Sequence, residues 1–120
     1  MDISKRIIDS VTVISLAGSL DSRSAPAVQE SILPALPEDG RVLLDLSEVS
    51  FVSSAGLRTM LLIYRQAQCV DTAVALVGLS DQLREVLSAT GFLGFFVVAD
   101  SVDHGLAELR VPQPEESSAV

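Results

Sequence analysis

The segment from Val42 to Leu57 constrains the fold of this chain more than any other. Its first five residues form a nearly continuous apolar run, which is the pattern of a strand whose two faces are both covered by helices. A segment in which polar residues predominate follows from Ser47 to Ser54, and apolar residues with helical spacing begin directly afterwards. We therefore predict a central strand at 42–46, a turn at its carboxyl end, and a helix that begins beside two serines.

Strand-like and helix-like segments alternate along the chain after an initial pair of strands. The strands are expected at residues 3–8, 11–16, 42–46, 73–77 and 95–99. Helices are expected to begin near Ala25, to run from Ala55 to Gln68, to follow a cap at Ser80 or Asp81 and end at Gly91, and to close the fold between the 100–103 cap region and Leu109. Because crossovers between parallel strands are right-handed, this order predicts one α/β domain, a mixed sheet of about four to five strands with about four helices. We expect the domain at 1–111 and a disordered tail at 112–120.

Apolar residues of the 55–68 helix are predicted to form its buried face. They are Leu57, Met60, Leu61, Tyr64 and Ala67. We interpret this stripe as core packing, and we expect Cys69 to pack as well. As the single cysteine of the chain, Cys69 excludes an intramolecular disulfide.

Composition excludes several classes of function. With 120 residues and 48% hydrophobic content, the chain has room for one domain with a core of its own. Its formal net charge of −8 would repel a phosphate backbone, so nucleic acid and anionic membranes are not expected partners. The apolar runs are too short to cross a bilayer and no signal sequence is visible, which predicts a cytoplasmic protein without direct membrane insertion.

No constellation of residues predicts catalysis, a cofactor or a metal site. A nucleophilic serine needs a nearby base, and the one histidine, His104, lies far from Ser53 and Ser54 in the sequence. The same isolation of His104 from Cys69 argues against a metal site, and no glycine-rich phosphate loop is present. By local pattern alone, the two serines are a helix cap with no further role, or a site where a helix N-terminus would stabilise an added phosphate.

Three motifs in sequence order connect these observations. They are Leu16-Ala-Gly-Ser-Leu-Asp21, Leu44-Asp-Leu-Ser-Glu-Val-Ser-Phe-Val-Ser-Ser-Ala-Gly-Leu57 and Leu87-Ser-Ala-Thr-Gly-Phe92. Together they resemble the STAS domain family, specifically the bacterial anti-sigma factor antagonists. The resemblance implies a STAS-like (SpoIIAA-like) fold and a binding protein that is not an enzyme. In its unphosphorylated form it would dock on an anti-sigma factor, commonly also a serine protein kinase, so that a sigma factor is released. A PP2C-type phosphatase would reverse the phosphorylation.

The resemblance also implies roles for individual residues. Ser54 occupies the phosphorylated position, whereas Ser53 stands where the family often has Asp and is the second candidate acceptor. Ala55 stands where a second serine is frequent. Asp21 matches the acidic residue of the family's Gly-x-Leu-Asp turn, as a partner contact or as a turn residue. The docking surface implied for this chain comprises Asp21, Ser53, Ser54, Gly56, Leu57 and Arg58.

Two other functions stay open at the level of sequence. One is a non-catalytic STAS scaffold subunit of a stress-signalling or lipid-transport complex, which would bind through the same face without turnover of phosphate. The other is nucleotide sensing, although no segment resembles a dedicated nucleotide pocket. The sequence also leaves weak homodimerisation open.

Overall fold

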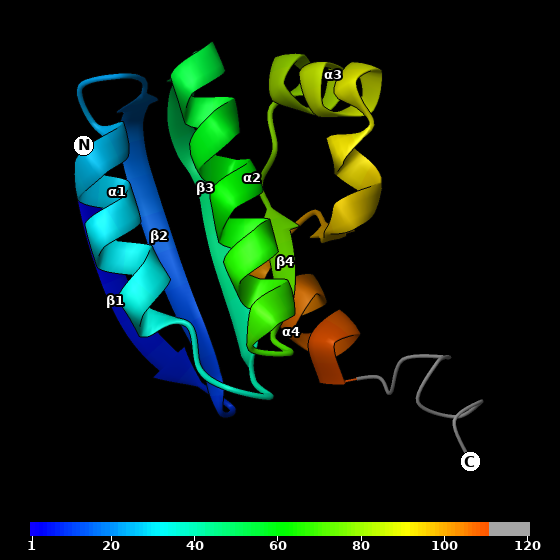
Figure 1. Ribbon diagram of the computed structural model, residues 1–120. Coiled ribbons are helices and arrows are strands. Elements are labelled where there is room, and N and C mark those ends of the chain that lie inside the picture. Colours follow the sequence, from blue (N-terminus) through cyan, green and yellow to red (C-terminus); the bar gives the residue numbers. More distant parts are fainter. Residues whose placement is uncertain (111–120) are drawn as a thin grey trace.

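A five-stranded sheet forms the centre of the molecule in the computed structural model, which describes residues 1–110 (Figure 1). Its strands lie in the order in which they occur in the chain: β1 (Asp2–Ile8), β2 (Val11–Leu20), β3 (Arg41–Val52), β4 (Ala73–Val77) and β5 (Val97–Ala99). β1 pairs with β2 in the antiparallel sense, and all other pairs are parallel. The mixed sheet with β3 at its centre is therefore confirmed. The tail expected at 112–120 and the domain end at 111 lie outside the described residues.

Helices cover both faces of the sheet. They are α1 (Ala25–Ile32), α2 (Ser54–Cys69), α3 (Asp81–Thr90) and α4 (Val102–Arg110), with short 3-10 helices η1 (Leu33–Ala35) and η2 (Phe92–Phe95). Residues of α1, α2 and α3 share one core cluster with Leu44, whereas Leu106 of α4 packs in a second cluster with Leu43. Because neighbouring residues of a strand point to opposite faces, α4 lies on the face opposite to α1 and α2. Among residues 1–110, no helix is long and apolar enough to cross a membrane.

Local sequence signals account for the limits of α3. The Ser80 hydroxyl accepts a hydrogen bond from the Leu83 amide at 3.1 Å, which caps the start of the helix. Gly91 ends it in the left-handed conformation at φ 82°, where a residue without Cβ avoids strain. Both predicted ends are thus confirmed.

The central strand is longer than predicted. We expected a turn from Ser47 onward, but β3 continues to Val52. Its last residues pair with the end of β2, where Ser19 lies opposite Phe51 and Leu20 opposite Val52. β4 stops at Val77, so this part of β3 has one neighbour strand and tolerates polar side chains that a fully covered strand would not.

Three further predictions differ from the structure. The strand expected from Phe95 begins at Val97, because residues 92–95 form η2 and the ring of Phe95 stacks on Tyr64 with centroids 4.6 Å apart. Cys69 was expected to pack, yet it is exposed at the end of α2. The buried face of α2 is also rotated from the predicted one and comprises Gly56, Thr59, Met60, Ile63 and Ala67.

Candidate functional site

The predicted site lies at the end of the sheet where β2 leads into α1 and β3 leads into α2. The Ser53 amide donates a hydrogen bond to the Leu20 carbonyl at 2.9 Å, which ties the two strand ends together. Gly56 is buried in the first turn of α2, and a Cβ there would lie 2.4 Å from the Leu20 carbonyl oxygen. Only glycine allows this close approach. It holds the loop that begins at Asp21 against the start of α2.

The two serines have different roles in the structure. Ser53 is the residue that caps α2: its backbone is extended and its hydroxyl accepts a hydrogen bond from the Gly56 amide at 3.3 Å. Ser54 is the first helical residue, it is exposed, and its hydroxyl makes no hydrogen bond within residues 1–110. The sequence predicted a cap at this pair of serines, and the structure assigns it to Ser53 alone.

Asp21 shapes the loop before α1. Its carboxylate accepts hydrogen bonds from the amides of Arg23 at 2.9 Å and Ser24 at 3.2 Å. These hydrogen bonds lower the pKa of the Asp21 carboxyl below its ordinary value, which keeps it charged. The Ser24 hydroxyl in turn donates to the Ser19 carbonyl at 2.7 Å. The geometry is that of a turn residue; a contact between Asp21 and a partner stays a prediction.

The remaining predicted residues follow in the first two turns of α2. Leu57 is half-buried and packs against the core, whereas Arg58 is exposed. The structure therefore brings the predicted residues together at one end of the sheet, with Ser54 and Arg58 facing solvent and Gly56 beneath them. Their role in docking remains a prediction.

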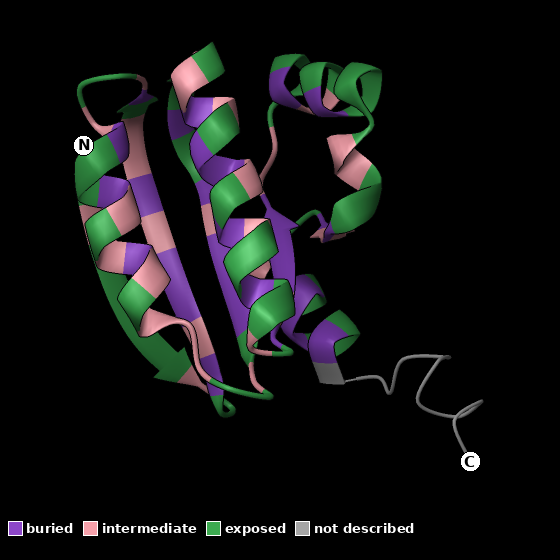
Figure 2. Cartoon of the chain, in the orientation of Figure 1, coloured by how far each residue is buried: buried purple, intermediate pink, exposed green. Residues whose placement is uncertain are grey.

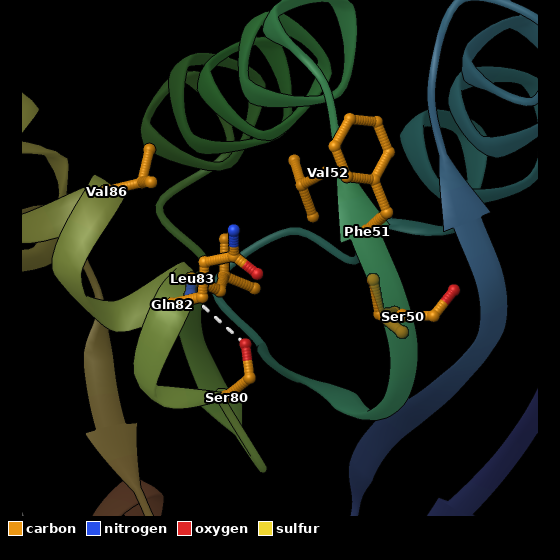
Figure 3. A pocket seen from close by; sticks show the side chains of 8 residues that line it. Ser50, Phe51, Val52, Ser80, Gln82, Leu83 and Val86 are labelled. Carbon is orange, nitrogen blue, oxygen red and sulfur yellow. Dashed lines mark hydrogen bonds between the residues drawn. The ribbon is translucent and has the colours of Figure 1, made fainter.

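Sequence reasoning missed a hollow beside these residues that both apolar and polar side chains line. Figure 3 shows the end of β3 opposite the first turns of α3, with the Ser50 hydroxyl pointing away from α3. Phe51 is 53% exposed and Val86 is 37% exposed. The lining comprises Val49, Ser50, Phe51, Val52, Ser80, Gln82, Leu83 and Val86. The available signal was a large aromatic residue, Phe51, close to Val49 and Val52 in a segment rich in serine.

The arrangement does not bring catalytic groups to the serines. His104 lies on α4, where its ring nitrogen is 3.3 Å from a carboxylate oxygen of Glu108, and α4 packs on the opposite face of the sheet from α2. Within the part of the chain that the structure describes, no cluster of His, Cys, Asp and Glu could hold a metal ion. What the site offers is an exposed hydroxyl, which can be modified, and a surface that another protein can contact.

The fold is that of a small α/β domain in which helices cover both faces of a mixed five-stranded sheet. The STAS domain family model matches residues 2–105, and the chain belongs to this family. BtrV of Bordetella bronchiseptica is 32% identical over 108 residues, covering 89% of this chain and 93% of BtrV. The anti-sigma-B factor antagonist of Listeria monocytogenes is 32% identical over 92 residues, covering 76% of this chain and 80% of the relative.

The fold agrees with solved structures as well. The Bacillus cell fate determinant SpoIIAA in its phosphorylated form superposes with a TM-score of 0.71 at 20% identity, covering 91% of this chain and all of that chain, 100%. At this identity the likeness shows the fold alone. Both the family and the fold expected from sequence are thus confirmed. STAS-domain anti-sigma factor antagonists are regulatory proteins rather than enzymes, in agreement with the prediction for this chain.

Proposed function

We propose that this protein is an anti-sigma factor antagonist that acts in the cytoplasm. In the unphosphorylated state it binds an anti-sigma factor that is also a serine kinase, and the sigma factor is released. Phosphorylation of Ser54 ends the interaction, and a PP2C-type phosphatase restores it. The name of the Listeria relative supports the partner class, and membership in the STAS family supports the mode of action.

The observation that carries the proposal is a difference between two adjacent hydroxyls. The Ser54 hydroxyl is exposed and makes no hydrogen bond within residues 1–110, whereas the Ser53 hydroxyl accepts one from the Gly56 amide. In the transfer, the Ser54 oxygen bonds to the γ-phosphorus of ATP held by the kinase, its proton leaves, and ADP departs. The product carries about −1.5 to −2 charges and three further acceptor oxygens. On a face packed against a partner, this change is expected to cost about 2 to 4 kcal/mol, which is roughly a thirty- to thousandfold loss of affinity.

The fold should survive the modification. Ser54 and Ala55 are the first two residues of α2, and their amides have no hydrogen-bond acceptor among residues 1–110. A phosphate at this end of a helix is stabilised by such amides and by the helix dipole. Ser53 still caps the helix, because its hydroxyl is not the one that reacts. Phosphorylation therefore changes the surface rather than the structure.

Mass spectrometry of the protein isolated from its own cells tests the site and the regulation together. One phosphate on Ser54, absent from Ser54→Ala and retained in Ser53→Ala, is the expected result. Phosphate on Ser53 alone would contradict the assignment. Stable co-purification with a membrane ATPase that is insensitive to Ser54→Glu would instead indicate the scaffold function.

A further inference from the structure

The first strand of the chain forms an open border of the sheet. β1 pairs with β2 on one side only, and no strand lies on its other side within residues 1–110 (Figure 1). Most of β1 is exposed along its length (Figure 2). The unpaired side of such a strand can pair with a strand of another chain. We call the side of β1 that faces away from β2 the β1 edge.

The turn between β1 and β2 determines which backbone groups lie on the β1 edge. Asp9 and Ser10 connect the strands at φ 52° and 67°, as in a two-residue type I′ turn. The flanking residues, Ile8 and Val11, are therefore a hydrogen-bonded pair, and bonded and non-bonded pairs alternate away from them. Every second residue of β1 thus directs its amide and carbonyl away from β2. These residues are Ile3, Lys5 and Ile7.

The charged side chains of β1 have no partner of opposite charge. Asp2, Lys5 and Arg6 are exposed, and none is in an ion pair within residues 1–110. Because side chains alternate along a strand, Asp2 and Arg6 lie on one face of β1 and Lys5 on the other. A strand that pairs with the β1 edge can therefore supply the missing opposite charges.

Two exposed apolar side chains lie at the two ends of β1. Ile7 is 76% exposed and Met1 is 39% exposed. Met1 continues the line of the strand, since its Cα lies 3.5 Å from the position that a Cβ of Gly18 on β2 would take. By alternation, both lie on the face opposite to Asp2 and Arg6. A partner that covers Met1 and Ile7 removes apolar surface from water.

We propose that the β1 edge binds the β1 edge of a second copy of this chain, in an antiparallel two-fold dimer centred on Ser4. Asp2 then lies opposite the partner's Arg6, and symmetry produces this pair twice. Met1 lies opposite the partner's Ile7, also twice. Opposite charges and apolar side chains are the cross-strand pairs that stabilise a sheet. The segment is thus complementary to an inverted copy of itself.

Other centres on β1 lack this complementarity. A two-fold axis at Lys5 places Lys5 opposite the partner's Lys5, and an axis at Arg6 places Arg6 opposite the partner's Arg6. Like charges directly opposite one another are destabilising. An axis at Ile3 leaves Arg6 and Ile7 without an opposite residue. The centre at Ser4 is the one that pairs opposite charges.

The dimer is independent of the proposed function. The centre of the interface lies on β1, whereas Ser54 follows the carboxyl end of β3. Because the two copies of β1 run in opposite directions, the two copies of Ser54 lie at opposite ends of the joined sheet. Dimerisation therefore gives one particle with two copies of the candidate site.

Sedimentation equilibrium of the full chain tests the dimer. The wild type should show a monomer–dimer equilibrium between about 10 µM and 1 mM. Asp2→Arg and Arg6→Asp should each weaken dimerisation by about tenfold or more, because each creates two like-charge pairs, and the double variant should restore it. Arg65→Asp, the same charge change at an exposed position of α2, should have less than about a twofold effect. A wild type that is monomeric over the whole range, or a double variant as weak as the single ones, would overturn the proposal.

Disulfide trapping tests the register. Cys69 is exposed, so Cys69→Ser is the background for both variants. Ser4→Cys places two thiols across the axis in a non-hydrogen-bonded pair, where Cα atoms are about 4.5 Å apart and a disulfide can form. In Lys5→Cys the two thiols are two residues out of step, with Cα atoms more than about 7 Å apart, too far for a disulfide.

Oxidised glutathione is the oxidant in this trapping experiment. It accepts the two electrons and two protons of the thiols and leaves as two reduced glutathione molecules. Gel electrophoresis without reductant should show a covalent dimer for Ser4→Cys and monomer for Lys5→Cys. Equal crosslinking of the two variants, or crosslinking of Lys5→Cys alone, would overturn the register centred on Ser4.

Discussion

Replacement of Gly56 by Ala tests whether the close contact between the two strand ends determines stability. The added Cβ would lie 2.4 Å from the Leu20 carbonyl oxygen and 2.9 Å from carbon atoms of Leu20 and Val52. A backbone oxygen cannot rotate away, so we expect a cost near the upper end of the about 1 to 3 kcal/mol typical of overpacking. Alanine regains up to about 1 kcal/mol through helix propensity. The net loss of unfolding free energy should be about 2 kcal/mol, or roughly 8 °C in Tm for a domain of this size.

Urea denaturation followed by circular dichroism measures this loss, and Gly94→Ala is the matched control. No heavy atom lies within 4 Å of the Cβ position of Gly94. The control should therefore be within about 0.5 kcal/mol of the wild type. If Gly56→Ala were as stable as Gly94→Ala, the contact with Leu20 would not constrain the loop, and the placement of Asp21 beside α2 would need another cause.

Three further changes probe the same region. Ser53→Ala should lower the unfolding free energy by about 1 kcal/mol because the α2 cap is lost, whereas Ser54→Ala should leave it nearly unchanged in thermal denaturation; equal effects would contradict the assignment of the cap. Thr59→Val should cost about 1 kcal/mol, because the buried Thr59 hydroxyl accepts a hydrogen bond from the Gln29 amide at 3.0 Å and donates to the Ala55 carbonyl. In a Gln29→Ala background the cost of Thr59→Val should shrink, and an unchanged cost would show that the two side chains are not coupled. For Asp21, whose pKa is lowered in the folded state, the stabilising effect is present at neutral pH and lost as pH falls through the folded pKa, below about 4. The stability advantage of the wild type over Asp21→Asn should therefore decline as the solution is acidified, and an advantage that does not change with pH would refute this origin.

Elements defined by local signals were predictable from sequence. The 73–77 strand is apolar on both faces and matches β4, and the α3 limits follow from Ser80 and Gly91, two residues whose effect is exerted within a single turn. The motif around Ser54 also predicted that this residue lies where the central strand leads into a helix, and Ser54 is the first residue of α2 after β3. These features need no knowledge of distant contacts.

Elements defined by distant contacts were not predictable. The extension of β3 depends on pairing with the end of β2, and the loss of strand structure at Phe95 depends on its ring stacking with Tyr64. Which of Ser53 and Ser54 caps the helix depends on where α2 begins, and hydrophobic spacing locates a helix end only to within a few residues. The sequence alone therefore does not show which of the two hydroxyls caps the helix and which one is exposed.

The division of roles between the capping serine and the exposed serine matters for the proposed phosphorylation switch in a domain of this size. If one serine both capped α2 and received the phosphate, modification would disturb a hydrogen bond worth about 1 kcal/mol to stability. Ser53 is the cap and Ser54 is exposed, so under the proposed function stability and regulation fall on adjacent residues. Under the proposed function, the kinase then changes the charge of the docking surface while the cap and the contact at Gly56 persist. Phosphorylated and unphosphorylated forms should accordingly have the same fold and differ in what they bind.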